Sequence, residues 1–262
     1  MTREERDGLQ LTPTQRDRFT KRIYGSAEFI RGLERYCLWI EDEDLNEIEL
    51  IDSVSKRMSN VRAMRLASRD RGAQEMATRA HQFREMNYGR SHVLVMPRTS
   101  SESRQHLPAG MIGAESTVSS EAFALFGAPL WQLGLLTSRL HLVWIATVCG
   151  KMKTDFRYSN TLGWNTFPVP TLTEQNKADL TACAQEILLA RENHFPATIA
   201  DLYDPENMPD DLRRAHEKND EVLERIYIGR KFKNDTERLE KLFELYTKMT
   251  AGPAKSKKGK AK

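Results

Sequence analysis

The stretch PLWQLGLLTSRLHLVWIATVCG, residues 129–150, decides most of the fold. It starts with a proline, ends with a glycine and is apolar almost all round, which predicts one long, mostly buried helix. Gln132, Arg139 and His141 interrupt it, so it falls short of the roughly 18 consecutive apolar residues that a membrane helix needs. We therefore expect a helix in the core of a globular protein and no transmembrane segment.

Upstream of this helix the pattern is mixed α and β. A helix is expected from Ser53 onward, capped by Asp52 or Ser53, because Val54, Met58 and Val61 recur at intervals of three and four. Short apolar or β-branched runs bounded by Gly, Pro or charged residues predict strands at 34–40, 92–96, 107–112, 116–119, 155–158 and 164–167. Residues 1–20 are polar without steady periodicity and are expected to form a lead-in outside the core.

Downstream, the Pro-Val-Pro of residues 168–170 marks the best domain boundary. Helical periodicity follows over residues 173–193, 210–227 and 234–250, and the Lys-rich residues 251–262 are expected to be disordered. The predicted fold class is α+β, with a mixed domain over 21–170 and an all-helical domain over 171–250.

The charge is segregated along the chain. The formal net charge is only +3, but residues 41–52 hold seven acids and no base, while residues 56–104 hold eleven Lys or Arg against four acids. Clustered bases are typical of a protein that binds a polyanion. A solvated helix face balanced by the acidic block before it explains the same pattern, and charge alone does not separate the two readings.

Catalytic and metal-binding signatures are missing from the sequence. It contains no GxGxxG, P-loop, HExxH or GxSxG motif, no Asn-Pro-Pro-aromatic loop of amino-methylating enzymes, and no persuasive nuclease core. The six histidines do not pair at metal-ligand spacing, and His141 is interpreted as a satisfied core histidine. Three distant cysteines and a charged N-terminus without an apolar segment favour a reducing cytoplasm.

Ten short phrases in one order resemble the MmeI-like DNA methyltransferases, single-chain restriction-modification enzymes that methylate adenine and carry their own target-recognition domain. The phrases are Ile23-Tyr24-Gly25-Ser26, Arg35-Tyr36-Cys37-Leu38-Trp39, Ser100-Ser101-Glu102-Ser103-Arg104, Leu136-Thr137-Ser138 with His141 and Trp144, Cys149-Gly150-Lys151, Phe156-Arg157-Tyr158-Ser159, Asn165-Thr166-Phe167-Pro168, Leu202-Tyr203-Asp204-Pro205, Ala215-His216 with Asn219-Asp220, and Phe232-Lys233-Asn234-Asp235. They span about residues 21–250.

The resemblance implies the carboxyl-terminal third of such an enzyme: a target-recognition domain over 21–170, then the helical domain. The family's nuclease and methyl-transfer motifs lie upstream of this region, so the chain itself is expected to be non-catalytic and to bind no cofactor. S-adenosylmethionine, and Mg where a nuclease is present, are expected for the full-length parent. The expected partners are double-stranded DNA and an upstream methyltransferase domain in the same or another chain.

In the family, the stretch after the long helix carries residues that choose a base pair, and here it matches residues 150–157. Lys153 and Asp155 are two apart, which on a strand places both on one face. Lys can donate to guanine O6 and N7, and Asp can accept from cytosine N4, so together they suit one G·C pair in the major groove. The alternative is a surface salt bridge of little consequence.

Further DNA contacts are expected from arginines and serines. Arg104, with Ser100, Ser101 and Ser103, is expected to form a polar loop that holds a phosphate or a base edge, and a turn whose serines satisfy their own backbone is the alternative. Candidate phosphate contacts are Arg62, Arg65, Arg69, Arg90, Arg98 and Arg157, with the two serines 100 and 101. Arg139 and Arg157 fit core-edge ion pairs equally well, and the four tryptophans are interpreted as core anchors.

A second hypothesis from another class is open at this point. The acidic helical domain could bind a partner protein, with the basic strip balancing charge. Salt dependence separates the two, because phosphate contacts weaken steeply with salt whereas apolar docking does not. A free-standing nuclease or transferase with a diverged site is the third alternative.

Overall fold

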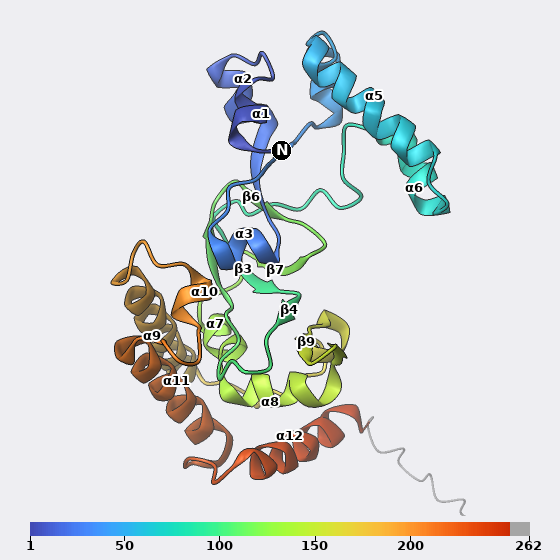
Figure 1. Cartoon of the computed structure of the whole chain (residues 1–262). Coiled ribbons are helices and arrows are strands. Elements are labelled where there is room, and N and C mark those ends of the chain that lie inside the picture. The colour runs from blue at the N-terminus through green and yellow to red at the C-terminus, as the bar shows by residue number, and fades with distance from the viewer. Residues whose placement is uncertain (252–262) are drawn as a thin grey trace, which may run out of the picture. The chain divides into compact units, whose positions relative to one another are not determined.

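The computed structural model describes residues 1–251, and the predicted α+β class is confirmed (Figure 1). The chain forms two compact units. Unit 1 comprises Met1–Val95 and Met111–Ala128, and unit 2 comprises Met96–Gly110 and the chain from Pro129 onward. Within residues 1–251, none of the helices combines the length and apolar character that would be needed to cross a membrane. The predicted tail over 251–262 lies outside the described residues except for Ala251.

Unit 1 contains two small sheets. In the first, β1 (Thr20–Tyr24) pairs antiparallel with β2 (Tyr36–Leu38) and parallel with β6 (Ser116–Val118). In the second, β3 (His92–Pro97) lies between β5 (Gly110–Gly113) and β7 (Ala122–Phe126), and the chain crosses between the units within β3 and β5. Strand β7 was not predicted. The helical elements of unit 1 are α1 (Arg3–Asp7), α2 (Pro13–Phe19), α3 (Ser26–Arg31), η1 (Asp42–Asp44), α4 (Leu45–Ile48), α5 (Asp52–Leu66), α6 (Arg71–Glu75) and η2 (Met76–Arg79).

Residues 1–20 are part of the core of unit 1, so the expectation of a lead-in outside the core was wrong. Thr2 and Thr12 cap α1 and α2, each in a capping box. Leu9 and Leu11, between these two short helices, and Phe19, the last residue of α2, are buried in a cluster with residues of α4 and α5. Two apolar residues in a loop and one at a helix end leave no helical periodicity, which is why the pattern was missed.

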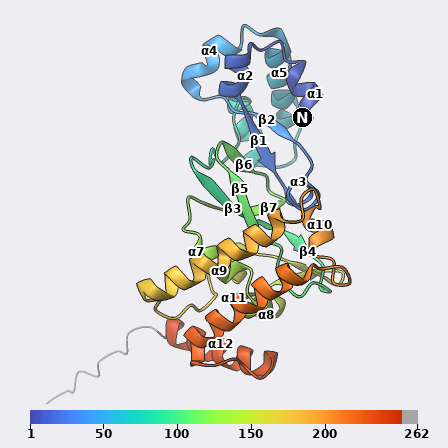
Figure 2. The same ribbon diagram turned by 90° about the vertical axis from the view of Figure 1, so that its left-hand side faces the viewer.

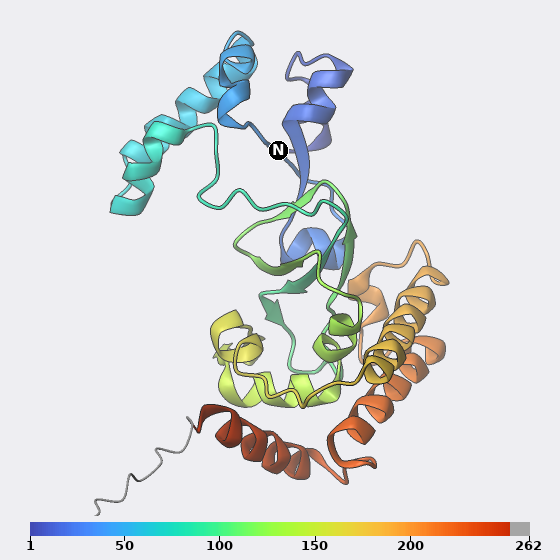
Figure 3. The same cartoon turned by 180° about the vertical axis from the view of Figure 1, so that it is seen from behind.

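Helix α5 confirms the predicted helix but not its details. Its N-cap position is occupied by Ile51, without a side-chain cap, and Asp52 is the first helical residue. Only Val54 and Met58 are buried, and Met64 is 65% exposed. The first two turns of α5 therefore face the core, and the later turns contact the following α6 and η2 (Figure 3).

In unit 2, the helix predicted over 129–150 is broken into α7 (Trp131–Leu136) and α8 (Arg139–Val148). Ser138 adopts extended backbone angles, and its hydroxyl accepts the amide hydrogen of His141 at 3.1 Å. The same hydroxyl donates to the Leu135 carbonyl at 2.7 Å. A serine N-cap in the middle of an apolar run therefore starts a second helix, a signal that the surrounding apolar residues masked.

After α8 the chain forms a hairpin of β8 (Gly150–Met152) and β9 (Asp155–Arg157), and β4 (Thr99–Ser100) adds to the free edge of β9. The strand predicted at 155–158 is thus present, and β8 was not predicted. The strand predicted at 164–167 is wrong, because Asn160–Trp164 form a π-helical turn, η3, capped by Ser159.

The remaining helices are α9 (Glu174–Glu192), α10 (Ile199–Leu202), α11 (Asp210–Ile228) and α12 (Asp235–Thr250). Three of them confirm the helices predicted from the sequence. Thr173 and Asn234 cap α9 and α12, and α9 lies beside α11 (Figure 2). The apolar faces of α9, α11 and α12 form one core with Leu140 and the fully buried Trp144 of α8. Trp131 and Trp164 are partly buried and pack against this core.

Candidate nucleic-acid interface

Strands β4, β9 and β8 and the loop 101–106 form one surface of unit 2, which we call the reading surface. Thr99 pairs opposite Arg157 and Ser100 opposite Phe156, so the loop after β4 starts beside the hairpin. The Lys151 ammonium also donates to the Glu102 carboxylate at 3.0 Å, which joins the hairpin to the loop. Two segments about fifty residues apart in the sequence are thereby held together.

Lys153 and Asp155 both lie at the tip of the hairpin, but not on one strand face as predicted. Met152 pairs opposite Asp155, so Lys153 and Thr154 form a two-residue turn. Lys153 has a φ of 59°, in the left-handed region that such hairpin turns require. The Lys153 side chain is exposed and Asp155 is half-buried. The two side chains are therefore neighbours at a turn, and the same-face argument does not hold.

Arg104 lies half-buried in the loop, close to Asp155. Its guanidinium is 3.5 Å from the Ser100 hydroxyl. Burial lowers the pKa of Arg104, and the carboxylates of Asp155 and Asp204 act in the opposite direction. An arginine remains protonated at neutral pH under such opposing effects. The reading surface thus carries a cation and a carboxylate from segments that the sequence separates.

The serines of the loop contribute less than predicted. Ser100 is 3% exposed, so its hydroxyl is not presented to a ligand, and we withdraw it as a phosphate contact. Ser101 and Ser103 share a hydrogen bond of 2.9 Å, and the Ser101 hydroxyl also accepts the Ser103 amide at 3.4 Å. These two serines therefore form hydrogen bonds within the turn, as the alternative to a phosphate-binding loop predicted. Ser101 is half-buried, so part of its surface is still accessible.

The predicted arginines are divided between the two units. In unit 2, Arg157 is exposed on β9, and Arg98 is half-buried, its carbonyl accepting the Tyr158 amide at 2.8 Å. In unit 1, Arg62, Arg69 and Arg90 have exposed side chains. Those three remain candidate phosphate contacts on a different compact unit from the hairpin.

Arg65 of α5 is used inside unit 1. Its guanidinium donates to the carbonyls of Met76, Arg79 and Gln82 at 2.7–2.8 Å. Burial is the main cause that lowers its pKa. Because these hydrogen bonds occupy the guanidinium, we withdraw Arg65 as a phosphate contact. Sequence periodicity cannot distinguish an arginine on the solvent side of a helix from one that folds back onto the following segment.

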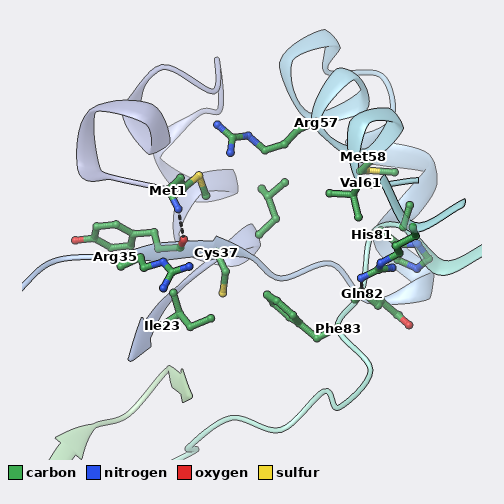
Figure 4. A pocket seen from close by; sticks show the side chains of 14 residues that line it. Met1, Ile23, Arg35, Cys37, Arg57, Met58, Val61, His81, Gln82 and Phe83 are labelled. Carbon is green, nitrogen blue, oxygen red and sulfur yellow. Dashed lines mark hydrogen bonds between the residues drawn. The ribbon is translucent and has the colours of Figure 1, made fainter. Parts of the chain in front are cut away.

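Unit 1 also holds a cavity of about 250 Å³ between β2, α5 and the segment 80–83. Figure 4 shows Arg35 and Arg57 around it, with Ile23, Val61 and Phe83 among the apolar side chains that line it. None of its lining residues is an acid. An arginine-lined cavity without a carboxylate does not suit the cationic sulfonium of S-adenosylmethionine, nor the ribose hydroxyls, which carboxylates bind well. The residues of this cavity therefore do not fit the methyl donor.

The structure adds residues whose roles the sequence did not suggest. His106, the last residue of the loop 101–106, is buried and connects through His216 and Tyr203 to Arg191, all three of them also buried. The sequence of α11 contained a signal for these buried residues. His216 and Asn219 are polar residues on its buried face, between Leu212 and Leu223. Buried polar residues need partners, so their position on the inner face predicts a hydrogen-bond network, but not which segment it holds.

Comparison with known proteins assigns the family. Residues 1–171 match the family model of the MmeI target recognition domain, and residues 172–253 match that of the MmeI C-terminal domain. The chain therefore belongs to the MmeI family, as the resemblance predicted. It is 38% identical over 232 residues to DNA methyltransferase A of Bacillus subtilis (strain 168), covering 88% of this chain and 26% of that relative.

A solved structure is also similar: that of the type IIL restriction-modification enzyme MmeI in complex with DNA. The TM-score is 0.89 at 32% identity, over 96% of this chain and 34% of that one. This chain thus spans between a quarter and about a third of the two relatives.

Proposed function

We propose that this chain recognises a specific sequence in duplex DNA for a restriction-modification enzyme that methylates adenine N6. The observation that carries the proposal is the reading surface, which gathers Lys153, Asp155 and Arg104 from two distant segments in a chain of the MmeI target recognition family. Lys and Arg are donors suited to guanine, and Asp is an acceptor suited to cytosine. The related MmeI was solved in complex with DNA.

In this proposal the chain supplies recognition and not chemistry. Methyl transfer with S-adenosylmethionine, and any Mg-dependent cleavage, belong to an upstream methyltransferase or nuclease part, in the same or another chain. The proposed location is the cytoplasm. Arg62, Arg69, Arg90, Arg98 and Arg157 would contribute salt-dependent affinity through phosphates. The comparisons do not favour the alternative of a protein-interaction module.

The test is selection of this chain on a randomised duplex pool at two salt concentrations. We expect enrichment of a short motif with a fixed G·C pair, and an affinity that falls steeply with salt. Binding without enrichment at either salt, or no binding, would contradict autonomous recognition by this chain.

A Lys153→Glu, Asp155→Arg double variant then tests whether these two residues contact the bases of one base pair. We expect the preferred base pair at one position to change while affinity for the newly selected sequence stays within about tenfold of wild type, since one good base contact contributes about 1–3 kcal/mol. Because Asp155 also acts on Arg104, the single variant Asp155→Asn is the control that removes the charge and keeps the shape. Equal loss of binding to every sequence would count against base reading.

A further inference from the structure

A buried polar network in unit 2 joins the reading surface to the C-terminal helices. Its members come from both family domains: His106 and Ala109 from the matched recognition domain, and Arg191, Tyr203, His216 and Asp220 from the matched C-terminal domain. All belong to one compact unit, although the family models divide the chain at residues 171 and 172.

The first link is Arg191 of α9. Its guanidinium donates to the Ala109 carbonyl at 2.7 Å and to the Tyr203 hydroxyl at 2.9 Å. Arg191 is 8% exposed and its guanidinium also lies over the Tyr203 ring, 4.9 Å from the centroid. A buried guanidinium without acceptors is strongly destabilising, so the hydrogen bond to the Ala109 carbonyl fixes the carboxyl end of the loop segment.

The second link is the Tyr203 hydroxyl and His216. The hydroxyl accepts from Arg191, which has only donors, so its own hydrogen is available to the Nε2 atom of His216 at 2.6 Å. This direction assigns the neutral His216 tautomer with its hydrogen on Nδ1, a buried atom that has no hydrogen-bond partner among the described residues. Full burial lowers the pKa of His216, in agreement with a neutral ring.

The third link is the stack of two imidazoles. The His216 and His106 rings lie 4.2 Å apart at an interplanar angle of 17°. His106 is two residues after Arg104 and is 6% exposed. Its Nδ1 atom has no hydrogen-bond partner among the described residues and lies 3.9 Å from the Asp220 carboxylate, which accepts the Arg139 amide at 2.7 Å. The position of His106 is therefore set by its stack on His216 of α11.

The opposite end of the segment is held by the hairpin. Strand β4 pairs with β9, and the Arg98 carbonyl accepts the Tyr158 amide. Between the two ends, the Arg139 guanidinium lies 3.5 Å from the Gln105 carbonyl, and Asp204, next to Tyr203, acts on the charge of Arg104. The loop is thus anchored on β9 on one side and on α8, α9 and α11 on the other.

We infer that Arg191, Tyr203 and His216 are positioning residues that set the sequence specificity of the reading surface by holding Arg104 and its loop in place. The inference rests on the proposed function and adds a role for the C-terminal helices. These residues touch no DNA in this account. They act through His106 and Ala109, because a reader that shifts by about an ångström loses the geometry of a bidentate base contact while its charge still attracts phosphate.

The test compares Tyr203→Phe with Tyr227→Phe in the full chain. Tyr227 is also buried, on α11, and its hydroxyl donates to the Pro168 carbonyl at 2.8 Å, away from the loop. Both variants lose one buried tyrosine hydroxyl, but only Tyr203→Phe breaks the network. Each is measured by backbone hydrogen exchange over residues 101–110 without DNA, and by selection and binding on duplex pools at two salts.

We expect Tyr203→Phe to speed exchange in 101–110 and to lower discrimination at one or more selected positions about tenfold, with an unchanged salt slope. Tyr227→Phe should leave both readouts at wild-type values. His216→Gln, which keeps an amide acceptor for the Tyr203 hydroxyl, should retain more discrimination than His216→Leu.

The inference is overturned if Tyr203→Phe folds and selects the same motif as sharply as wild type, or if affinity for all sequences falls equally. It is also overturned if Tyr227→Phe loses as much discrimination, since the effect would then be general destabilisation. Failure of the wild-type chain to select any motif is a distinct outcome, which removes the proposed function and the inference with it.

Discussion

The two units differ in where they place polar side chains. In unit 1 the charged groups near the core pair outward: buried Lys21 forms an ion pair with Glu115, which is 63% exposed, and buried Asp44 pairs with Arg18 at the surface. Unit 2 buries polar groups more completely: His141, His216 and Asn219 are each 0% exposed, whereas the buried polar side chains of unit 1 are 3–8% exposed. Buried polar groups contribute little net stability but have few alternative partners, so they favour one arrangement. The unit with the proposed base readers is the one built for a single geometry.

Gly134 tests how closely unit 2 is packed, and its replacement should give the largest effect. An added Cβ would lie 2.8 Å from the Asn219 Oδ1 atom and 3.3 Å from the Leu180 carbonyl, where α7 meets α9 and α11. It would also disturb the 2.9 Å hydrogen bond from the Asn219 amide to the Gly134 carbonyl. We expect Gly134→Ala to lower the free energy of unfolding by about 2–5 kcal/mol, as overpacking and a lost buried hydrogen bond combine.

The matched control is Gly113→Ala in unit 1, where an added Cβ meets no atom within 4 Å. Its urea midpoint should lie close to that of wild type. If the two variants were destabilised equally, the conclusion that unit 2 is more closely packed at Gly134 than unit 1 is at Gly113 would be wrong.

The pH dependence of stability tests the buried histidines of unit 2. Burial lowers the pKa of His106 to about 4 and that of His141 to about 3, and it also lowers that of His216. Because the folded pKa values lie below the unfolded value near 6.5, these groups stabilise the fold above pH 6.5 and lose that contribution as the pH falls. Asp220 opposes them, since burial raises its pKa to about 7 and its contribution is lost as the pH rises.

Between pH 6.5 and 4.5 the two histidines with folded pKa values near 4 and 3 outweigh the one aspartate by about one proton, and His216 acts in the same direction. The free energy of unfolding should then fall by on the order of 1 kcal/mol per pH unit or more. Urea titrations followed by tryptophan fluorescence measure this in unit 2, which holds Trp131, Trp144 and Trp164, while only Trp39 is in unit 1. A midpoint that does not move between pH 6.5 and 5 would disprove the assignment of neutral buried histidines.

The smallest effect is expected on α5, where one arginine is structural and its neighbour is not. Arg65→Met removes the three hydrogen bonds to the carbonyls of 76–82 and should destabilise this segment of unit 1 by about 1–3 kcal/mol, seen as faster hydrogen exchange there. Arg62→Met is the control: stability should not change, and if Arg62 contacts phosphate the salt slope of DNA binding should fall by about one. If Arg62→Met lowered the stability of unit 1 and Arg65→Met lowered the salt slope, the assignment of Arg65 as a structural residue and Arg62 as a phosphate contact would be wrong.

Much of the fold could be predicted from the sequence, because long amphipathic segments with capping residues are local signals. The helices α9, α11 and α12 and the strands β2, β3 and β9 lie where periodicity and β-branched runs place them. The break at Ser138 was missed because a single capping serine has to be recognised within a mostly apolar run on both sides of it. Trp164–Phe167 failed as a strand because apolar content alone does not separate a strand from a helical turn.

The site was predictable only in part. Lys153, Asp155 and Arg104 stay predictions from residue chemistry and family resemblance, and the structure brings their segments together through β4 and β9. The turn at Lys153 depends on strand register, which a two-residue spacing does not determine. Whether Arg65 faces solvent or a carbonyl, and what His216 stacks on, depend on contacts between residues far apart in the chain.

The position of the Arg191–Ala109 hydrogen bond has a consequence for how such genes exchange parts. The two residues lie on opposite sides of the boundary between the matched family domains, yet inside one compact unit. If our inference is right, a recombination joint at that boundary would separate the loop from the helices that position it. Functional chimaeras are therefore expected when residues 96–251 are inherited as one block, or when both parents carry the same residues at 106, 191, 203 and 216.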